Sequence, residues 1–292
     1  VEKGRILGIV GESGCGKSVT SMSILQLLGS NARISGGSIK LDGKELIGLP
    51  EKEMCRIRGN DIAMIFQDPM TALNPTLTIG TQLMEPIMLH QNCGKKEAWT
   101  RAVDVLKRVG IAAPEKRMKE YPHQLSGGMR QRVMIAMAVS CEPRLLIADE
   151  PTTALDVTIQ AQILELMCEL REKMGTAIML ITHDMGVVAE TADDVLVLYA
   201  GKAVEYGSIE DIFERPKHPY TQGLLNSIPR LDEDVELLNT IEGTVPAPDA
   251  MPAGCRFAPR CPYGKDRCMK EKPGVYHAGN SLVSCFRYEG EK

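Results

Sequence analysis

Short apolar runs recur along the chain and alternate with longer amphipathic stretches. Each run has four or five residues, the length of a strand that is buried on both faces. The runs cover residues 6–10, 62–66, 145–148, 177–181 and 195–199. Helical patterns lie between several of them, including residues 17–28 and 157–173. This alternation predicts an α/β fold with a mostly parallel sheet and helices on both of its faces.

Three regions depart from this alternation. Residues 36–43 have the pattern of a turn, a short strand and a turn, which predicts a small antiparallel β patch. Helical patterns dominate from about 78 to 121, so we expect a helical subdomain over about 78–140. After about Pro216, Pro, Gly and Cys become frequent, which predicts a loop-rich extension. We therefore expect a core domain over residues 1–215 and a separate extension over residues 216–292.

Composition narrows the class of protein. The chain has 292 residues, of which 43% are hydrophobic and 25% are charged, as in ordinary globular proteins. The net charge of −4 lacks the basic excess that is typical of nucleic-acid binders. No apolar run approaches the roughly 18–20 residues that a membrane-spanning helix needs. The chain is thus not expected to cross a membrane, although it could dock on a membrane protein.

A phosphate-binding motif follows the first predicted strand. Residues 11–18 fit G-x-x-x-x-G-K-[ST], between a strand and a helical pattern. Glycines in such a loop let backbone N–H groups surround phosphate oxygens, and the helix N-terminus adds its positive end. Lys17 is expected to reach the β- and γ-phosphates and Ser18 to bind Mg²⁺. Cys15 lies inside this loop, and we interpret it as a small filler rather than as a reactive thiol.

Two carboxylates directly follow the predicted strand at residues 145–148. Hard cations such as Mg²⁺ prefer oxygen ligands, and Asp149 is placed to supply one. Glu150 follows directly and is the candidate general base for an attacking water. Together with the upstream phosphate loop, this pair predicts a nucleotide hydrolase.

The order of the remaining motifs resembles the ABC ATPase family over roughly residues 4–210. The motifs are the phosphate loop, Gln67, the L-S-G-G segment at 125–128, Asp149-Glu150, Leu155-Asp156 and His183. The resemblance implies that Gln67 senses the γ-phosphate through Mg²⁺ or water and that His183 orients the water. It also implies that each ATP lies between the phosphate loop of one subunit and the L-S-G-G segment of another. The expected nucleotide-binding residues are Gly11, Ser13, Gly14, Cys15, Gly16, Lys17, Ser18, Val19, Ser126, Gly127, Gly128 and Asp156. The expected Mg²⁺ ligands are Ser18, Gln67 and Asp149.

Other segments resemble the ATPase subunits of oligopeptide, dipeptide and nickel importers. These segments are residues 66–75, 121–128, 218–225 and 243–285. The resemblance implies a peripheral subunit on the cytoplasmic face of the membrane that energises import of oligopeptides or dipeptides. Its expected partners are two transmembrane permease subunits, a second ATPase subunit that is favoured to be a paralogue, and indirectly an extracytoplasmic solute-binding protein. A nickel or other small-solute importer is an alternative, and a non-transport ABC ATPase is a weaker one.

Four of the nine cysteines gather in the extension. Cys255, Cys261, Cys268 and Cys285 have the spacing C-x5-C-x6-C-x16-C. Four thiolates can bind Zn²⁺ or an iron–sulfur cluster, and this spacing leaves zinc, a cluster and free thiols all open. The resemblance to dipeptide importer ATPases with this pattern implies a 4Fe-4S cluster, with Zn²⁺ as the alternative. His277 is expected to be a surface residue rather than a ligand.

The chain begins close to its first predicted strand. Only ten residues precede Gly11, whereas ABC ATPases usually place an aromatic residue well upstream, where it stacks on adenine. We therefore expect that front strands are missing. Loss of such a stacking contact would cost about 1–3 kcal/mol by analogy with other base–aromatic contacts.

Overall fold

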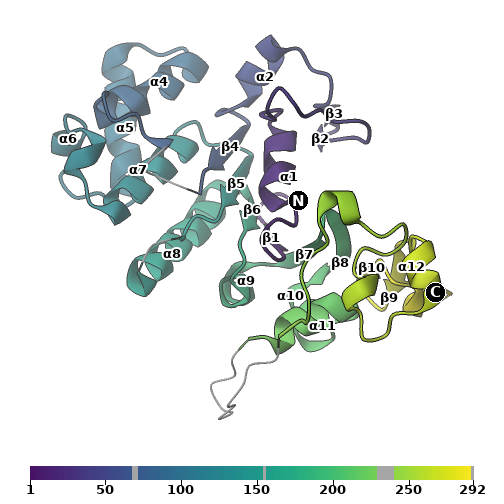
Figure 1. Ribbon diagram of the computed structural model, residues 1–292. Helices are drawn as coiled ribbons and strands as arrows, with labels where there is room; N and C mark the ends of the chain where they lie inside the picture. The colour runs from purple at the N-terminus through teal and green to yellow at the C-terminus, as the bar shows by residue number, and fades with distance from the viewer. Residues whose placement is uncertain (68–71, 154–155, 229–239, 291–292) are drawn as a thin grey trace. The chain divides into compact units, whose positions relative to one another are not determined.

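The computed structural model of the protein describes residues 1–67, 72–153, 156–228 and 240–290. The chain divides into two units, each made of two stretches of sequence. The first contains Val1–Arg5 and Ser18–Leu180, and the second contains Ile6–Lys17 and Ile181–Lys292. The α-helices and β-strands of each unit are labelled in Figure 1.

Parallel strands form the framework of the first unit. Strand β4 (Ile62–Ile65) pairs with β5 (Leu145–Asp149), so that Ile62 lies opposite Leu145. Strand β6 (Ala177–Ile181) follows β5 in the strand order, and all five of its residues are buried. Burial on both faces explains why these strands are continuous apolar runs. The expected antiparallel patch is a two-stranded hairpin of β2 (Lys40–Leu41) and β3 (Lys44–Glu45).

Helices make up most of the rest of the first unit. Helices α4, α5 and α7 contact one another, which matches the helical stretch that the sequence predicts (Figure 1). Helix α8 matches the predicted helix at 157–173 almost residue for residue, whereas α1 ends four residues before the predicted position 28. The helices are α1 (Lys17–Ile24), α2 (Glu51–Ile57), α4 (Ile79–Gln91), α5 (Lys95–Arg108), α6 (Pro114–Arg117), the 3-10 helix η1 (Pro122–Gln124), α7 (Gly127–Val139) and α8 (Val157–Met174).

The second unit contains a mixed sheet in the order β1-β7-β8-β10-β9. Strands β1 (Ile6–Val10) and β7 (Asp194–Tyr199) are parallel, and β7 turns back into the antiparallel strand β8 (Lys202–Ser208). The helices of this unit are α9 (Met185–Thr191), α10 (Ile209–Glu214), α11 (Pro219–Asn226), α12 (Asp266–Lys270) and the 3-10 helices η2 (Pro248–Ala250), η3 (Ala258–Arg260) and η4 (Phe286–Tyr288).

The C-terminal region contributes two strands that the sequence pattern does not predict. Strand β10 (Ser281–Val283) pairs antiparallel with β8, and β9 (Tyr276–Ala278) pairs with β10. His277 is exposed on β9, as expected for a surface residue. The loop-rich stretch is thus joined to the sheet of the second unit by backbone hydrogen bonds.

Buried aromatic rings attach the C-terminal region to the rest of the second unit. Phe257 lies 5.1 Å from Tyr199 of β7, 5.4 Å from Tyr220 of α11 and 5.8 Å from His218, measured between ring centroids. All four side chains are at most 2% exposed. Ring contacts of this kind contribute about 0.5–1.5 kcal/mol each beyond area burial, so this cluster is a substantial part of the unit's core.

Candidate functional site

The predicted phosphate loop follows β1 in the second unit. A Cβ atom on Gly11 would lie 2.2 Å from the carbonyl oxygen of Leu198, so only glycine lets the loop pass this close to β7. The Cys15 N–H donates to the Glu12 carbonyl oxygen at 3.2 Å, and the Cys15 carbonyl accepts from the Gly201 N–H at 2.7 Å. These contacts fix the path of the loop on β7 and on the turn that follows it.

Lys17 is held inside the curve of the loop. Its side chain is 6% exposed, and Nζ donates to the carbonyl oxygens of Gly11 at 2.7 Å and Glu12 at 3.2 Å. Both partners are neutral, so these two contacts leave the positive charge uncompensated for an incoming anion. Ser13, Gly14, Ser18 and Val19 are exposed, and Gly16 is half-buried.

Cys15 is a buried packing residue of the loop. It is 1% exposed, and burial raises the pKa of its thiol. A buried thiol with a raised pKa reacts slowly, because the thiolate is the reactive species. This supports the interpretation of Cys15 as a packing residue.

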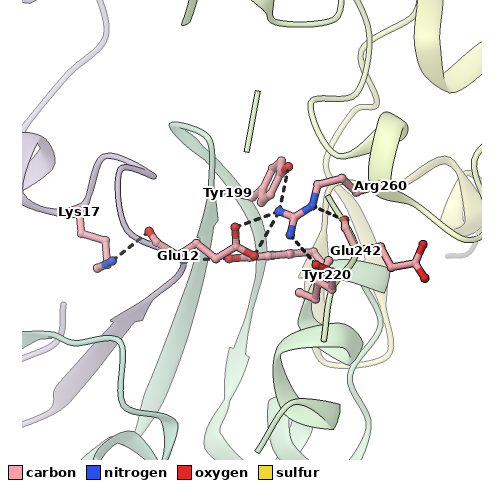
Figure 2. A network of polar contacts seen from close by, with 7 residues as sticks. Glu12, Lys17, Tyr199, Tyr220, Glu242 and Arg260 are labelled. Carbon is pink, nitrogen blue, oxygen red and sulfur yellow. Dashed lines mark hydrogen bonds and ion pairs between the residues drawn. The ribbon is translucent and has the colours of Figure 1, made fainter. Parts of the chain in front are cut away.

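Glu12 lies at the centre of a polar network that sequence reasoning missed (Figure 2). Its carboxylate forms an ion pair with Arg260, 2.9 Å from Nη1 to Oε2, and its backbone N–H donates to the Tyr220 hydroxyl at 2.9 Å. Arg260 also donates to the carbonyl oxygens of Glu242 at 2.9 Å and Ile241 at 3.1 Å. Both Glu12 and Arg260 lie within the segments singled out from the sequence, but no spacing signal pairs residues 248 positions apart.

In the first unit the structure brings two predicted catalytic residues together. Gln67 Nε2 donates to Glu150 Oε2 at 2.8 Å, and the Thr153 hydroxyl donates to the same oxygen at 3.0 Å. Glu150 has a φ of 48°, the left-handed region that non-glycine residues rarely adopt, at a cost of about 1–3 kcal/mol. This conformation turns the chain sharply after β5, where the half-buried carboxylate meets Gln67.

Asp149 is the last residue of β5 and is 3% exposed. A carboxylate this deeply buried is costly unless charge or hydrogen bonds compensate it. The role of Asp149 as an oxygen ligand for Mg²⁺ stays a prediction.

The predicted intersubunit residues occupy two helix N-termini of the first unit. Ser126 caps α7 by accepting from the Met129 N–H at 3.4 Å, and Asp156 caps α8 by accepting from the Ile159 N–H at 3.0 Å. A Cβ on Gly128 would lie 3.2 Å from Ile159 Cγ2. Ser126 and Asp156 thus have structural roles as caps, worth about 0.5–2 kcal/mol each. Both side chains remain exposed, as an intersubunit role requires.

His183 follows β6 and belongs to the second unit, as do residues 11–17 of the phosphate loop. Its side chain is exposed, and the neighbouring Asp184 caps α9 by accepting from the Gly186 N–H at 2.8 Å. Leu155 and residues 68–71 of the predicted importer segment lie outside the described residues.

The four C-terminal cysteines line one cavity of about 80 Å³ in the second unit. They are half-buried free thiols, and burial raises the pKa of Cys255, Cys261 and Cys285. A Cβ on Gly254 would lie 2.3 Å from the Cys268 carbonyl oxygen, which itself accepts from the Cys255 N–H at 2.8 Å. Nevertheless, within the described ranges no three His, Cys, Asp or Glu side chains are arranged as metal ligands. The predicted iron–sulfur cluster is therefore not confirmed.

Comparison with known proteins assigns the family. Residues 1–153 match the family described as ABC transporter, and residues 204–268 match the one described as oligopeptide/dipeptide transporter, C-terminal region. The chain belongs to the ABC transporter ATPase family. Members of this family hydrolyse ATP, so the chain is an ATPase. No helix in the described part of the chain is long and apolar enough to cross a membrane.

Relatives share the sequence over nearly its full length. The oligopeptide transport ATP-binding protein AppD of Bacillus subtilis (strain 168) is 57% identical over 100% of this chain and 89% of its own. The oligopeptide transport ATP-binding protein OppD of Escherichia coli (strain K12) is 53% identical over 97% of this chain and 84% of its own. The dipeptide transport ATP-binding protein DppD of Haemophilus influenzae is 51% identical over 98% of this chain and 86% of its own.

Solved structures of this ABC family confirm the predicted fold class. The dimeric ATP-binding cassette MJ0796, bound to ADP and Pi, superposes with a TM-score of 0.62 at 29% identity over 72% of this chain and 87% of its own. CbiO1 from Clostridium perfringens, part of an ABC transporter complex, superposes with a TM-score of 0.64 at 29% identity over 74% of this chain and 81% of its own.

Proposed function

We propose that this ABC ATPase energises the import of oligopeptides or dipeptides from the cytoplasmic face of a membrane. The observation that carries the proposal is the combined match to the ABC transporter family and to the oligopeptide/dipeptide transporter C-terminal region in one chain. Its proposed partners are two membrane permease subunits, a second ATPase subunit that is a paralogue, and indirectly an extracytoplasmic solute-binding protein. Residues 1–215 would form the nucleotide-binding domain and residues 216–292 the importer extension.

Two sets of residues carry the proposed nucleotide chemistry. The phosphate loop would bind the phosphates through its N–H groups and Lys17, and Ser18, Gln67 and Asp149 would hold Mg²⁺. The L-S-G-G segment and Asp156 would contact ATP held by the opposing subunit. ATP would then join two subunits head to tail, and its hydrolysis would loosen them.

Glu150 is the proposed general base. Its Oε2 accepts hydrogen bonds from Gln67 and Thr153, which hold the carboxylate directly after β5, where it would meet the attacking water. Hydrolysis of ATP depends mainly on positioning and on neutralising charge, and His183 would help to orient the attacking water.

Substitution Glu150→Gln tests this assignment. The amide keeps the size and hydrogen-bonding capacity of the side chain but cannot accept a proton, so turnover should fall by about 10²–10⁴-fold while ATP binding persists. Phosphate release and equilibrium binding of a fluorescent ATP analogue measure the two properties. Glu165→Gln, an exposed carboxylate on α8, is the matched control and should behave as wild type. Wild-type turnover in Glu150→Gln would disprove the role.

The same variant tests the proposed partner. With Mg-ATP, Glu150→Gln should accumulate an ATP-bound dimer with a paralogous ATPase subunit. Size-exclusion chromatography with light scattering measures the mass. A stable dimer of the chain with itself would contradict the preference for a paralogue.

We further propose that Cys255, Cys261, Cys268 and Cys285 bind a 4Fe-4S cluster, with Zn²⁺ as the alternative. In support, the four thiols line one cavity, and four thiolates are the donor set of both groups. Within the described residues these thiols do not form a ready ligand set, so binding would require them to rearrange. Anaerobic purification followed by iron, sulfide and zinc analysis tests the proposal, with Cys261→Ser as the variant and exposed Cys55→Ser as the control. A metal-free wild-type protein that retains native structure would disprove it.

A further inference from the structure

Glu12 is an acidic side chain inside a loop that is proposed to bind a polyanion. Its carboxylate is 27% exposed and belongs to the second residue of the loop whose backbone would surround the phosphates. An unpaired negative charge there would repel a nucleotide, because Coulomb interactions over a few ångströms remain strong near a protein surface. The loop therefore needs a cation to compensate Glu12.

Arg260 is that cation and is held rigidly. Its Nη1 donates to both carboxylate oxygens of Glu12, at 2.9 and 3.2 Å, and its side chain is only 6% exposed. Its Nε and Nη2 donate to the carbonyl oxygens of Glu242 and Ile241. With its donors engaged on several sides, the guanidinium has little freedom to leave the carboxylate.

Packing of the C-terminal region determines the position of Arg260. Arg260 ends η3, and Phe257, directly before η3, packs against Tyr199 and Tyr220. Tyr220 in turn accepts the backbone N–H of Glu12. One buried cluster thus positions both the side-chain partner and the backbone partner of Glu12. Figure 2 shows these two partners, Arg260 and Tyr220, next to Glu12.

We propose that Arg260 is a positioning residue for nucleotide binding, which neutralises Glu12 and so makes the affinity for ATP depend on the C-terminal region. This inference rests on the proposed binding of phosphates at the loop. Without Arg260, the carboxylate repels the phosphates.

A charge-rescue experiment tests the inference in the full chain. Mg-ATP is titrated into wild type, Arg260→Met, Glu12→Gln and the double variant. We expect the Kd of Arg260→Met to rise on the order of tenfold, as one uncompensated charge near a surface would cause. Because the double variant has no unpaired carboxylate, its Kd should return to within about twofold of that of Glu12→Gln alone. Arg260→Lys keeps the charge but not the forked geometry, and it should restore part of the affinity.

Ionic strength provides a readout that a purely structural role would not move. The ratio of the Kd values of Arg260→Met and wild type should shrink between about 0.05 M and 0.5 M salt, because screening weakens the repulsion. Arg267→Met is the matched control, since this arginine of the same region is 47% exposed and pairs with Glu271 and Glu289 instead. It should bind Mg-ATP as wild type does.

Two results would overturn the inference. One is wild-type affinity in Arg260→Met, and the other is a double variant that binds no better than Arg260→Met. Lys17→Ala distinguishes failure of the inference about Arg260 from failure of the proposed phosphate site. If Lys17→Ala abolishes binding while Arg260→Met does not, only the inference fails; if neither weakens binding, the proposed phosphate site fails as well.

Discussion

Acid should destabilise the second unit through His218. This side chain is 1% exposed at the start of α11, where its Nδ1 accepts the Tyr220 N–H at 3.1 Å. Burial lowers its pKa from 6.5 to about 3. The folded state therefore keeps the imidazole neutral at pH values where the unfolded chain already binds a proton, and stability falls as pH drops below about 6.5.

The size of the effect follows from the linkage between proton binding and folding. Between pH 6.5 and 3, the free energy of unfolding should fall by about 1.4 kcal/mol per pH unit, which gives a loss of about 1.4 kcal/mol at pH 5.5. The nearby Glu205 acts in the opposite direction, because burial raises its pKa and acid then favours its folded, protonated form. A single pH profile therefore contains both contributions.

A matched variant separates the contribution of His218 from that of Glu205. His218→Asn keeps a side chain that can cap α11 but does not titrate. Urea unfolding followed by the near-ultraviolet circular dichroism of the tyrosines should show that wild type loses about 1.4 kcal/mol more than His218→Asn between pH 7.5 and 5.5. Equal losses in the two proteins would show that His218 is not a buried neutral group and would refute the reasoning.

Other substitutions test the packing around the loop. Phe257→Ala should lower the free energy of unfolding by about 3–5 kcal/mol, measured by urea unfolding, because it empties the buried ring cluster; a loss below about 1 kcal/mol would contradict the packing described. Gly11→Ala should abolish nucleotide binding in an equilibrium titration, since its Cβ would lie 2.2 Å from the Leu198 carbonyl oxygen; normal affinity would mean that the loop does not need this close approach. Iodoacetamide should label the native protein at exposed Cys55 well before buried Cys15, as mass spectrometry can follow, and equal rates would contradict the burial of Cys15.

The buried strands of this fold are predictable from sequence because burial on both faces leaves an uninterrupted apolar run. Helix ends are less so. The pattern extends α1 to residue 28, yet the helix ends at Ile24 and Gln26 takes a φ of 51°. Arg58 donates to the Leu25 carbonyl oxygen at 2.8 Å and to that of Gln26 at 3.2 Å. A side chain from a distant segment thus satisfies these carbonyls and ends the helix, which no local pattern records.

The candidate site likewise contains residues that the sequence predicts and residues that it does not. Lys17, Asp149 and Glu150 stand at fixed distances from strand ends, so their roles are predicted by motif and context. The pair Glu12 and Arg260 is set by tertiary packing across most of the chain, and each residue alone is an ordinary charged side chain. Strands β9 and β10 have three residues each, too few for a period-two pattern to separate them from loop.

The pairing of β10 with β8 has a consequence for how this chain behaves when shortened. A chain that ends near residue 215 would leave β8 with a row of unsatisfied backbone N–H and C=O groups, a template for pairing with other molecules. With the C-terminal region present, β9 is the described strand at this edge of the sheet, and it offers only three residues to a neighbour. We therefore expect the C-terminal strands to protect the protein against aggregation, and a preparation trimmed to the ATPase core should self-associate even where its nucleotide loop is intact.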